Sequence, residues 1–556
     1  MSKCRILGVC VGLMFALMVI GLAPAKLMAA PPPQMGGATG PGCASDRAVV
    51  THHAGGEQVQ APSGMQAPVP CSVSLDMRVG ELSLVVSKAG TVVLRPIWKG
   101  DTNGPPNGTE LFTAGSANPT FATTPAYDTN LWADPQTGRL FWMSCGGRCA
   151  HPLFEISDDD GKTWYSGPRP LTGPGPYGVG TGGYDHVQVF GGPPVASMKG
   201  LLKGGYPNVV YACLGHDPLK CEKSQDGGLT WGPELVIPFP PTAQMKSIQA
   251  AGGGICSAFG LQGMVESDGT VIVPYEPCNR PYVAVSHDEG AHWTLVQVTN
   301  EEEIGYGYPS LGMDSAGNLY AAWVQSSDRM LYMAISRDKG MHWSAPMMIA
   351  APGVNEAAIP FLVAGKDGQV AVSYYGSKNA PHPFPAYCNP LPAGRRGMGG
   401  FTPPPPGPTQ TCPGYENETW DTYVTETWDA TDAQPVFWST TLNDPSRPSW
   451  YGITPSELGV VRWDEDFTVG ASFFRGGSPR LDIDYYGSAM GPDGTVWVGY
   501  AQMCPYGQTL GSAGNPNCPS GNGPTDGGFF TILGRLVPQG GSQRSMVMGR
   551  RAKPIN

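Results

Sequence analysis

The sequence carries little charge for its length, and its basic residues are scattered. Asp, Glu, Lys and Arg make up 14% of the 556 residues, and the formal net charge is −11. Nucleic-acid binding needs clustered Lys and Arg to neutralise phosphates, so this composition argues against nucleic acid as a partner. The pair Arg550-Arg551 lies in a segment, 541–556, that we expect to be a flexible tail.

Beyond its first residues the chain also lacks any long apolar run. The single run extends from Ile6 to about Leu22, follows basic residues and precedes small residues up to Ala30. That order predicts a secretory signal peptide over residues 1–30 and a secreted or periplasmic protein. A retained N-terminal anchor is the alternative. With the signal removed, no membrane span is expected.

The cysteines lack the spacing of a metal site, because no C-x-x-C pair occurs and no pair of histidines lies at ligand spacing beside them. We therefore expect no cofactor, although Asp482 and Asp484, two residues apart, leave Ca²⁺ open as an alternative. Twelve cysteines remain after the signal, an even number typical of disulfides in an exported chain. The predicted pairs are Cys43–Cys71, Cys145–Cys149, Cys213–Cys221, Cys256–Cys278, Cys388–Cys412 and Cys504–Cys518.

Glycine, proline and aromatic residues are abundant instead. The chain contains 78 Gly and 57 Pro together with 14 Trp, 22 Tyr and 17 Phe. Many turn residues combined with many large rings are typical of a turn-dense all-β fold.

One motif, S-x-D-x-G-x-x-W, occurs four times, with starts 67, 62 and 50 residues apart. This spacing fits one four-stranded propeller blade per repeat. Ser and Asp side chains can bond backbone N–H groups across a tight turn, Gly can take positive φ, and Trp can pack between sheets. We expect the charged middle positions, such as Asp160 and Glu289, to be solvated. The structural residues of the motif are Ser157, Asp159, Gly161, Trp164, Ser224, Asp226, Gly228, Trp231, Ser286, Asp288, Gly290, Trp293, Ser336, Asp338, Gly340 and Trp343.

Asp-Gly-type turns before apolar strands predict hairpins between these motifs. Together the signals predict a six-bladed β-propeller over residues 71–540, closed by an N-terminal strand from 72–98. Residues 31–70 are expected to be poorly ordered, and 377–415 to form a Pro-rich insertion loop. The predicted blades lie at about 119–167, 184–235, 255–298, 306–349, 357–442 and 481–537.

The third repeat, DGTVIVPYEPCNRPYVAVSHDEGAHW, resembles the sialidase superfamily, whose members carry Asp-box (BNR) repeats. The resemblance covers about 119–537 and implies a six-bladed propeller. In catalytic members three arginines bind the substrate carboxylate, a Tyr paired with a Glu is the nucleophile, and an Asp is the acid/base.

By this resemblance Arg280 and Arg329 match the second and third arginines and are assigned to substrate binding. Tyr486 stands in the place of the nucleophile, with Tyr485 beside it. The first arginine has no counterpart, since TTPAYDTNLW stands where the family has its F/Y-R-I-P sequence.

The segments before the inner strands should line the opening of the propeller. They supply aromatic residues beside carboxylates, a combination suited to sugars. Tyr184, Tyr306 and Tyr485 are the expected aromatic contacts, and Asp128, Asp185 and Glu356 are candidate catalytic carboxylates alongside Tyr486.

Three functions fit the sequence. The chain could be an exo-acting glycoside hydrolase of sialidase-like type, a non-catalytic propeller that binds a glycan or a protein, or a structural surface protein. A glycan is the expected partner in the first two, and the fold alone does not decide among them.

Overall fold

The computed structural model describes residues 43, 47–78, 82–96, 109–113, 120–122, 127–145, 152–171, 185–215, 219–238, 262–277, 280–301, 309–379, 419–451, 487–503 and 529–539. Within these ranges the structure is almost wholly β, and its only helix is the 3₁₀ helix η1 (Ala196–Leu201). None of the helical structure described there has the length and apolar character needed to cross a membrane.

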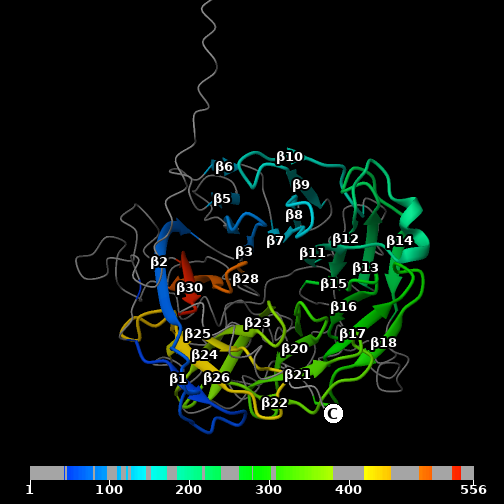
Figure 1. Ribbon diagram of the computed structural model, residues 1–556. Helices are drawn as coiled ribbons and strands as arrows, with labels where there is room; N and C mark the ends of the chain where they lie inside the picture. The colour runs from blue at the N-terminus through cyan, green and yellow to red at the C-terminus, as the bar shows by residue number, and fades with distance from the viewer. Residues whose placement is uncertain are drawn as a thin grey trace, which may run out of the picture.

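The strands form antiparallel sheets arranged in a ring (Figure 1). Blade 1 contains β3 (Leu82–Val86), β4 (Val92–Pro96), β5 (Thr109–Thr113) and β6 (Thr120–Ala122). Blade 2 contains β7 (Tyr127–Ala133), β8 (Leu140–Cys145), β9 (Leu153–Ser157) and β10 (Tyr165–Ser166). Blade 3 contains β11 (Asp185–Gly192), β12 (Val209–Gly215), β13 (Leu219–Ser224) and β14 (Glu234–Ile237). Blade 4 contains β15 (Met264–Val265), β16 (Val271–Tyr275), β17 (Tyr282–Ser286) and β18 (Thr294–Gln297).

The remaining sheets complete the ring. Blade 5 contains β19 (Ser310–Met313), β20 (Leu319–Val324), β21 (Leu331–Ser336) and β22 (Met347–Met348). Blade 6 contains β23 (Glu356–Ala364), β24 (Val370–Ser377), β25 (Thr419–Thr427), β26 (Phe437–Thr441), β1 (Val50–His52) and the short β27 (Trp450–Tyr451). Blade 7 contains β28 (Gly487–Met490), β29 (Val496–Met503), β30 (Phe529–Val537) and β2 (Val69–Arg78).

The inner strands contact one another in sequence from β3 through β7, β11, β15, β19, β23 and β28, and β28 contacts β3 again. The predicted β-propeller and its closure by an N-terminal strand are confirmed, since β2 pairs with β30 in the last blade. All six predicted blades are present as blades 2–7. The ring also holds blade 1, a separate sheet that begins within the segment expected to supply the closing strand.

The sequence predicts poor order for residues 31–70. Residues 47–59 depart from this prediction, because they cross the outer edge of blade 6 in a defined arrangement. β1 pairs with β26, and the Gly55 N–H donates to the carbonyl of Met348 in blade 5 at 2.9 Å. Two predicted disulfides, Cys43–Cys71 and Cys213–Cys221, are present. The other four predicted pairs include residues outside the described ranges, as do the signal peptide, the insertion loop from residue 380 and the tail.

The Asp boxes have the hydrogen bonds that their sequence predicts. In blade 3 the Ser224 hydroxyl donates to Asp226 at 2.8 Å and accepts the Gly228 N–H at 2.8 Å. Asp226 also accepts the backbone N–H and the hydroxyl of Thr230, at 2.8 and 2.6 Å. Burial alone would raise the pKa of Asp226, but these hydrogen bonds lower it. The same Ser–Asp and Gly–Ser bonds occur in the boxes that begin at Ser157, Ser286 and Ser336.

The residue between Asp and Gly in each box joins neighbouring blades and is not simply solvated as expected. It has positive φ in all four boxes, and it contacts the preceding blade near the connection between its first two strands. Glu289 is only 1% exposed and accepts from the Lys223 ammonium at 3.0 Å. The contacts are Asp160 with Thr91, Gly227 with Arg139, Glu289 with Val195, and Lys339 with Asp268. The left-handed turn therefore aims this residue at the neighbouring sheet.

Blade 6 contains a fifth, degenerate box that the four-residue pattern misses. The Thr427 hydroxyl donates to Asp429 at 2.6 Å, and Asp429 accepts the Val436 N–H at 3.1 Å. Thr replaces Ser here and the Gly-x-x-Trp part is absent, so the S-x-D-x-G-x-x-W pattern does not match this segment.

Candidate functional site

The chain direction in each blade separates two faces of the ring. In a four-stranded antiparallel blade, the Asp box after the third strand and the first hairpin lie at one end. The second hairpin and the start of the next inner strand lie at the other end, which we call the mouth face. The predicted site residues Arg280, Arg329, Asp128, Asp185 and Glu356 all fall on the mouth face by this topology.

The structure brings two predicted residues together on the mouth face. Arg329 lies in the hairpin between β20 and β21, and Glu356 is the first residue of the next inner strand, β23. The Arg329 Nη1 donates to Glu356 Oε1 at 2.9 Å, and the side chains are 9% and 1% exposed. The Ala357 N–H donates to the Arg329 carbonyl at 2.8 Å, so backbone and side chain both join blades 5 and 6.

Arg329 has a φ of 59°, in the left-handed region that a non-glycine residue rarely adopts. The strain is tolerated because the Arg329 N–H donates to the Gln325 carbonyl at 2.9 Å and the guanidinium is held by Glu356. Strained backbone and buried charge are both costly, and both are found together at functional sites more often than elsewhere.

Arg280 does not share this arrangement. It lies in blade 4 before β17, and its Nη1 donates at 2.7 Å to the carbonyl of Asn300, just beyond the outermost strand β18. This contact directs the guanidinium toward the outer strand of its own blade. Arg280 is thus bound at the outer edge of blade 4, whereas Arg329 lies where blades 5 and 6 meet.

Two of the predicted carboxylates lie at irregular starts of inner strands. The pairing of β7 with β8 shifts register between Tyr127 and Thr129, which places Asp128 in the bulge. The pairing of β11 with β12 shifts between Asp185 and Val187. Bulges re-aim side chains and are common beside active sites. This signal is invisible in sequence, because it depends on which strands pair.

The other predicted residues, Tyr184, Tyr306, Tyr485 and Tyr486, lie outside the described residues, as do Asp482 and Asp484. Within the described ranges no group of three His, Cys, Asp or Glu side chains is arranged to hold a metal ion.

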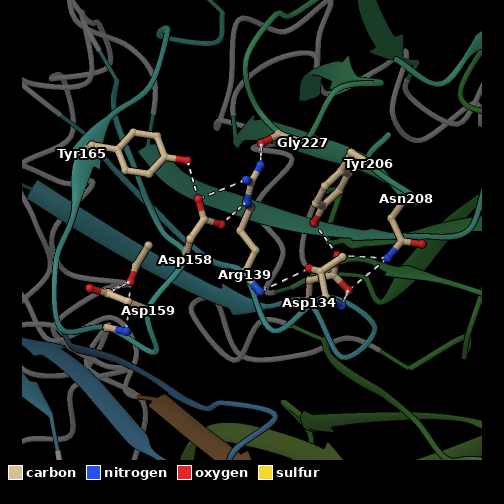
Figure 2. Close-up of polar contacts among 11 residues, drawn as sticks. Asp134, Arg139, Asp158, Asp159, Tyr165, Tyr206, Asn208 and Gly227 are labelled. Atoms are coloured by element: carbon tan, nitrogen blue, oxygen red, sulfur yellow. Dashed lines mark hydrogen bonds and ion pairs between the residues drawn. The ribbon is translucent and has the colours of Figure 1, made fainter. Parts of the chain in front are cut away.

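A second polar cluster lies on the opposite face, between blades 2 and 3 (Figure 2). Asp134 is fully buried after β7; it accepts the Tyr206 hydroxyl and, at 3.0 Å, the Asn208 amide. Arg139 forms two bonds with Asp158, at 2.6 and 3.1 Å, and donates to the Gly227 carbonyl at 3.0 Å.

The partners of Asp134 come from its own turn and from blade 3, including the Gln136 N–H at 2.8 Å. Burial raises the pKa of Tyr206, and the charge of Asp134 adds to this effect. A carboxylate satisfied in this way is suited to joining blades and not to proton transfer, so we assign this cluster a structural role.

Replacing Asp134 with alanine is expected to lower the free energy of unfolding by about 3 kcal/mol, because two buried donors lose their acceptor. Urea unfolding at pH 7 measures the change. Asp158→Asn, at the exposed end of the same cluster, is the matched control and is expected to cost less than about 1 kcal/mol. Equal effects of the two substitutions would contradict the structural role of Asp134.

Comparisons with known proteins find similarity to solved structures alone. No protein-family model and no curated protein matches the sequence. A protein of unknown function from Dyadobacter fermentans is similar over 86% of this chain and 100% of its own, at 13% identity and a TM-score of 0.38.

Two sialidase structures are also similar. The leech intramolecular trans-sialidase matches over 76% of this chain and 64% of its own, at 12% identity and a TM-score of 0.35. The NanB sialidase of Streptococcus pneumoniae matches over 80% of this chain and 67% of its own, at 11% identity and a TM-score of 0.35. These TM-scores all lie below 0.5, so the likenesses carry no argument about family or activity.

Proposed function

We propose that the protein is an exported, sialidase-like propeller that engages a glycan on its mouth face, beside the Arg329–Glu356 pair. The observation that carries this proposal is the buried pair itself. It sits where blades 5 and 6 meet, at the start of an inner strand, and it includes a residue in the left-handed region. The bulge at Asp128 and the bulge at His186, next to Asp185, lie on the same face.

The pair also bears on the kind of glycan. A sialic acid carboxylate needs arginine groups that converge on it, because charge-assisted bonds supply much of its recognition. Here Arg329 is bound to Glu356, and Arg280 is bound to the Asn300 carbonyl at the outer edge of blade 4. We therefore expect neutral glycans to bind more tightly than sialosides.

Hydrolysis is a further part of the proposal. Tyr486 is the proposed nucleophile, with Asp128 or Asp185 as the acid/base. Glu356, held by Arg329, is assigned to positioning and not to proton transfer. A propeller with the same mouth but without turnover would be a glycan-binding protein.

A glycan array followed by titration calorimetry tests the binding site. We expect Asp128→Asn and Asp185→Asn to weaken the affinity for the best neutral glycan by at least about tenfold, as expected for the loss of a charge-assisted bond. Asp158→Asn, on the opposite face, is the matched control and should leave affinity unchanged. Absence of binding to any glycan, or equal binding by all variants, would contradict the proposed glycan site.

The hydrolytic part is tested separately with fluorogenic neutral glycosides and sialosides. Turnover by the wild type that is lost in Tyr486→Phe is the expected result. Binding without turnover would identify a non-catalytic glycan-binding propeller.

A further inference from the structure

The N-terminal segment 47–59, here called the strap, is fastened to the outer edge of blade 6. Its strand β1 pairs with β26 over three residues. The Arg47 Nη1 donates to the carbonyls of Thr441 and Leu442, at 3.1 and 2.6 Å. The strap therefore adds a further strand to a blade whose edge would otherwise be open.

A buried histidine stands at the centre of this contact. His52 is 0% exposed and stacks on Phe437, with ring centroids 5.7 Å apart. Its Nδ1 lies 2.9 Å from the carbonyl oxygen of His53, and its Nε2 lies 2.8 Å from the Ser439 hydroxyl. A carbonyl oxygen can only accept, so Nδ1 carries the hydrogen and Nε2 of the neutral ring accepts from Ser439.

The hydroxyl of Ser439 belongs to a chain of hydrogen bonds that runs through the core of blade 6. It lies 2.7 Å from the Thr425 hydroxyl, and Thr425 lies 3.4 Å from the Tyr374 hydroxyl. The Ala351 N–H donates to the Tyr374 oxygen at 2.8 Å, which leaves the Tyr374 proton to point toward Thr425. Each hydroxyl therefore donates to the next, and the chain ends on the lone pair of His52.

Protonation of His52 would reverse this direction. Nε2 would become a donor, so the Ser439 hydroxyl could no longer donate to it. If that hydroxyl turned to donate to Thr425, Thr425 would in turn donate to Tyr374. The Tyr374 proton would then have no acceptor among the described residues around it, and an unmade hydrogen bond in a core is costly. The hydrogen bonds of the docked strap therefore require the neutral form of His52.

The described residues around His52 offer no charge that would offset this cost. Burial lowers its pKa, the hydrogen bond to His53 raises it, and the charge of His53 lowers it again. Arg47 is bound to the carbonyls of Thr441 and Leu442, and Glu57 is exposed at the far end of the strap. On β25 the neighbouring carboxylate Glu426 is bound by Gln369.

We propose that β1 is an acid-sensitive latch: protonation of His52 releases the strap from the outer edge of β26. His52 is neutral when the strap is docked and can take up a proton when the strap is released. Docking is therefore complete above pH 6.5, the ordinary pKa of histidine, and weakens as pH falls below it.

Hydrogen–deuterium exchange of the whole protein, read by mass spectrometry as protection factors, tests the latch. Between pH 7.5 and pH 5.5 the protection of residues 50–52 and of β26 is expected to fall about tenfold. The protection of β16 and β17 in blade 4 should not change. Equal protection of β1 at both pH values would overturn the proposal.

Two variants separate His52 from its neighbour. His52→Gln keeps an acceptor for Ser439 but cannot take up a proton, so its strap should be less protected at pH 7.5 and insensitive to pH. His53→Asn is the matched control and should retain the tenfold change. Full pH sensitivity in His52→Gln would overturn the role of His52.

A second measurement does not depend on a variant that folds. Long-range ¹⁵N–¹H correlation spectra of the histidine-labelled wild type report which ring nitrogen carries the hydrogen. The Nδ1–H form at pH 7.5, with a titration midpoint below 6.5, is the expected result. The Nε2–H form, or an ordinary midpoint, would contradict the directed chain.

Discussion

Replacing Glu426 with glutamine is expected to raise the free energy of unfolding at pH 9 by about 5 kcal/mol. Glu426 is fully buried on β25 and accepts from the Gln369 amide at 3.0 Å, while that amide also contacts the Gly494 carbonyl of blade 7 at 3.3 Å. Burial raises the pKa of Glu426 from 4.5 to about 8, and the bond from Gln369 offsets only part of the rise.

The sign of the stability change follows from the raised pKa of Glu426. In the folded protein Glu426 remains protonated up to about pH 8, whereas in the unfolded chain it ionises above its ordinary pKa of 4.5. The folded state binds the additional proton between these values, so the wild type loses stability as pH rises from 4.5 to 8. Glutamine has the shape of the protonated acid and no proton to lose, so Glu426→Gln should lack this decline.

Urea unfolding of both proteins between pH 5 and pH 9 measures the difference. The two curves should nearly coincide at pH 5 and diverge above it. Asp444→Asn is the control of opposite sign, because hydrogen bonds from Ser446 lower the pKa of Asp444. That substitution should give no gain at pH 9. Parallel curves for the wild type and Glu426→Gln would show that Glu426 is not held protonated.

The parts of the fold that the sequence predicts are those in which residues close in the chain interact. The Asp box needs only eight consecutive residues, and all four boxes have the expected bonds. Blade 1 lacks a box, and its outer strands β5 and β6 span only five and three residues. Its first hairpin does carry a signal, the turn from Ser87 to Thr91, where the Ser87 N–H donates to the Thr91 carbonyl.

The contacts that the sequence does not predict join segments that meet only because the ring closes. Arg329 and Glu356 lie on different blades, and His52 and Ser439 are 387 residues apart. The composition of 31–70 is rich in Gly, Pro and Ala, and three residues of strand do not stand out from it. The contact of Glu289 with the preceding blade is not predicted from the sequence for a related reason. A charged residue in a turn is usually solvated, and only the neighbouring blade shows that this one is buried.

The Arg329–Glu356 pair gives the second large expected effect. Arg329→Met should lower the free energy of unfolding by about 3–5 kcal/mol, since it leaves the buried carboxylate of Glu356 without the guanidinium that balances it. Glu356→Gln should also destabilise the protein, by leaving the guanidinium of Arg329 without that carboxylate. The double variant should recover most of the loss, because replacing a whole buried pair is often close to neutral.

Urea unfolding of the wild type, both single variants and the double variant at pH 7 gives the coupling energy, which we expect to be about 3 kcal/mol. The exposed pair Lys220–Glu234, at 2.9 Å, is the matched control, and its coupling should be below about 1 kcal/mol. Methionine and arginine carry the same backbone strain at a φ of 59°, so the strain cancels in the cycle. If the losses at Arg329 and Glu356 simply add, the two side chains are not a buried unit, and the mouth face loses the feature on which its proposed glycan site depends.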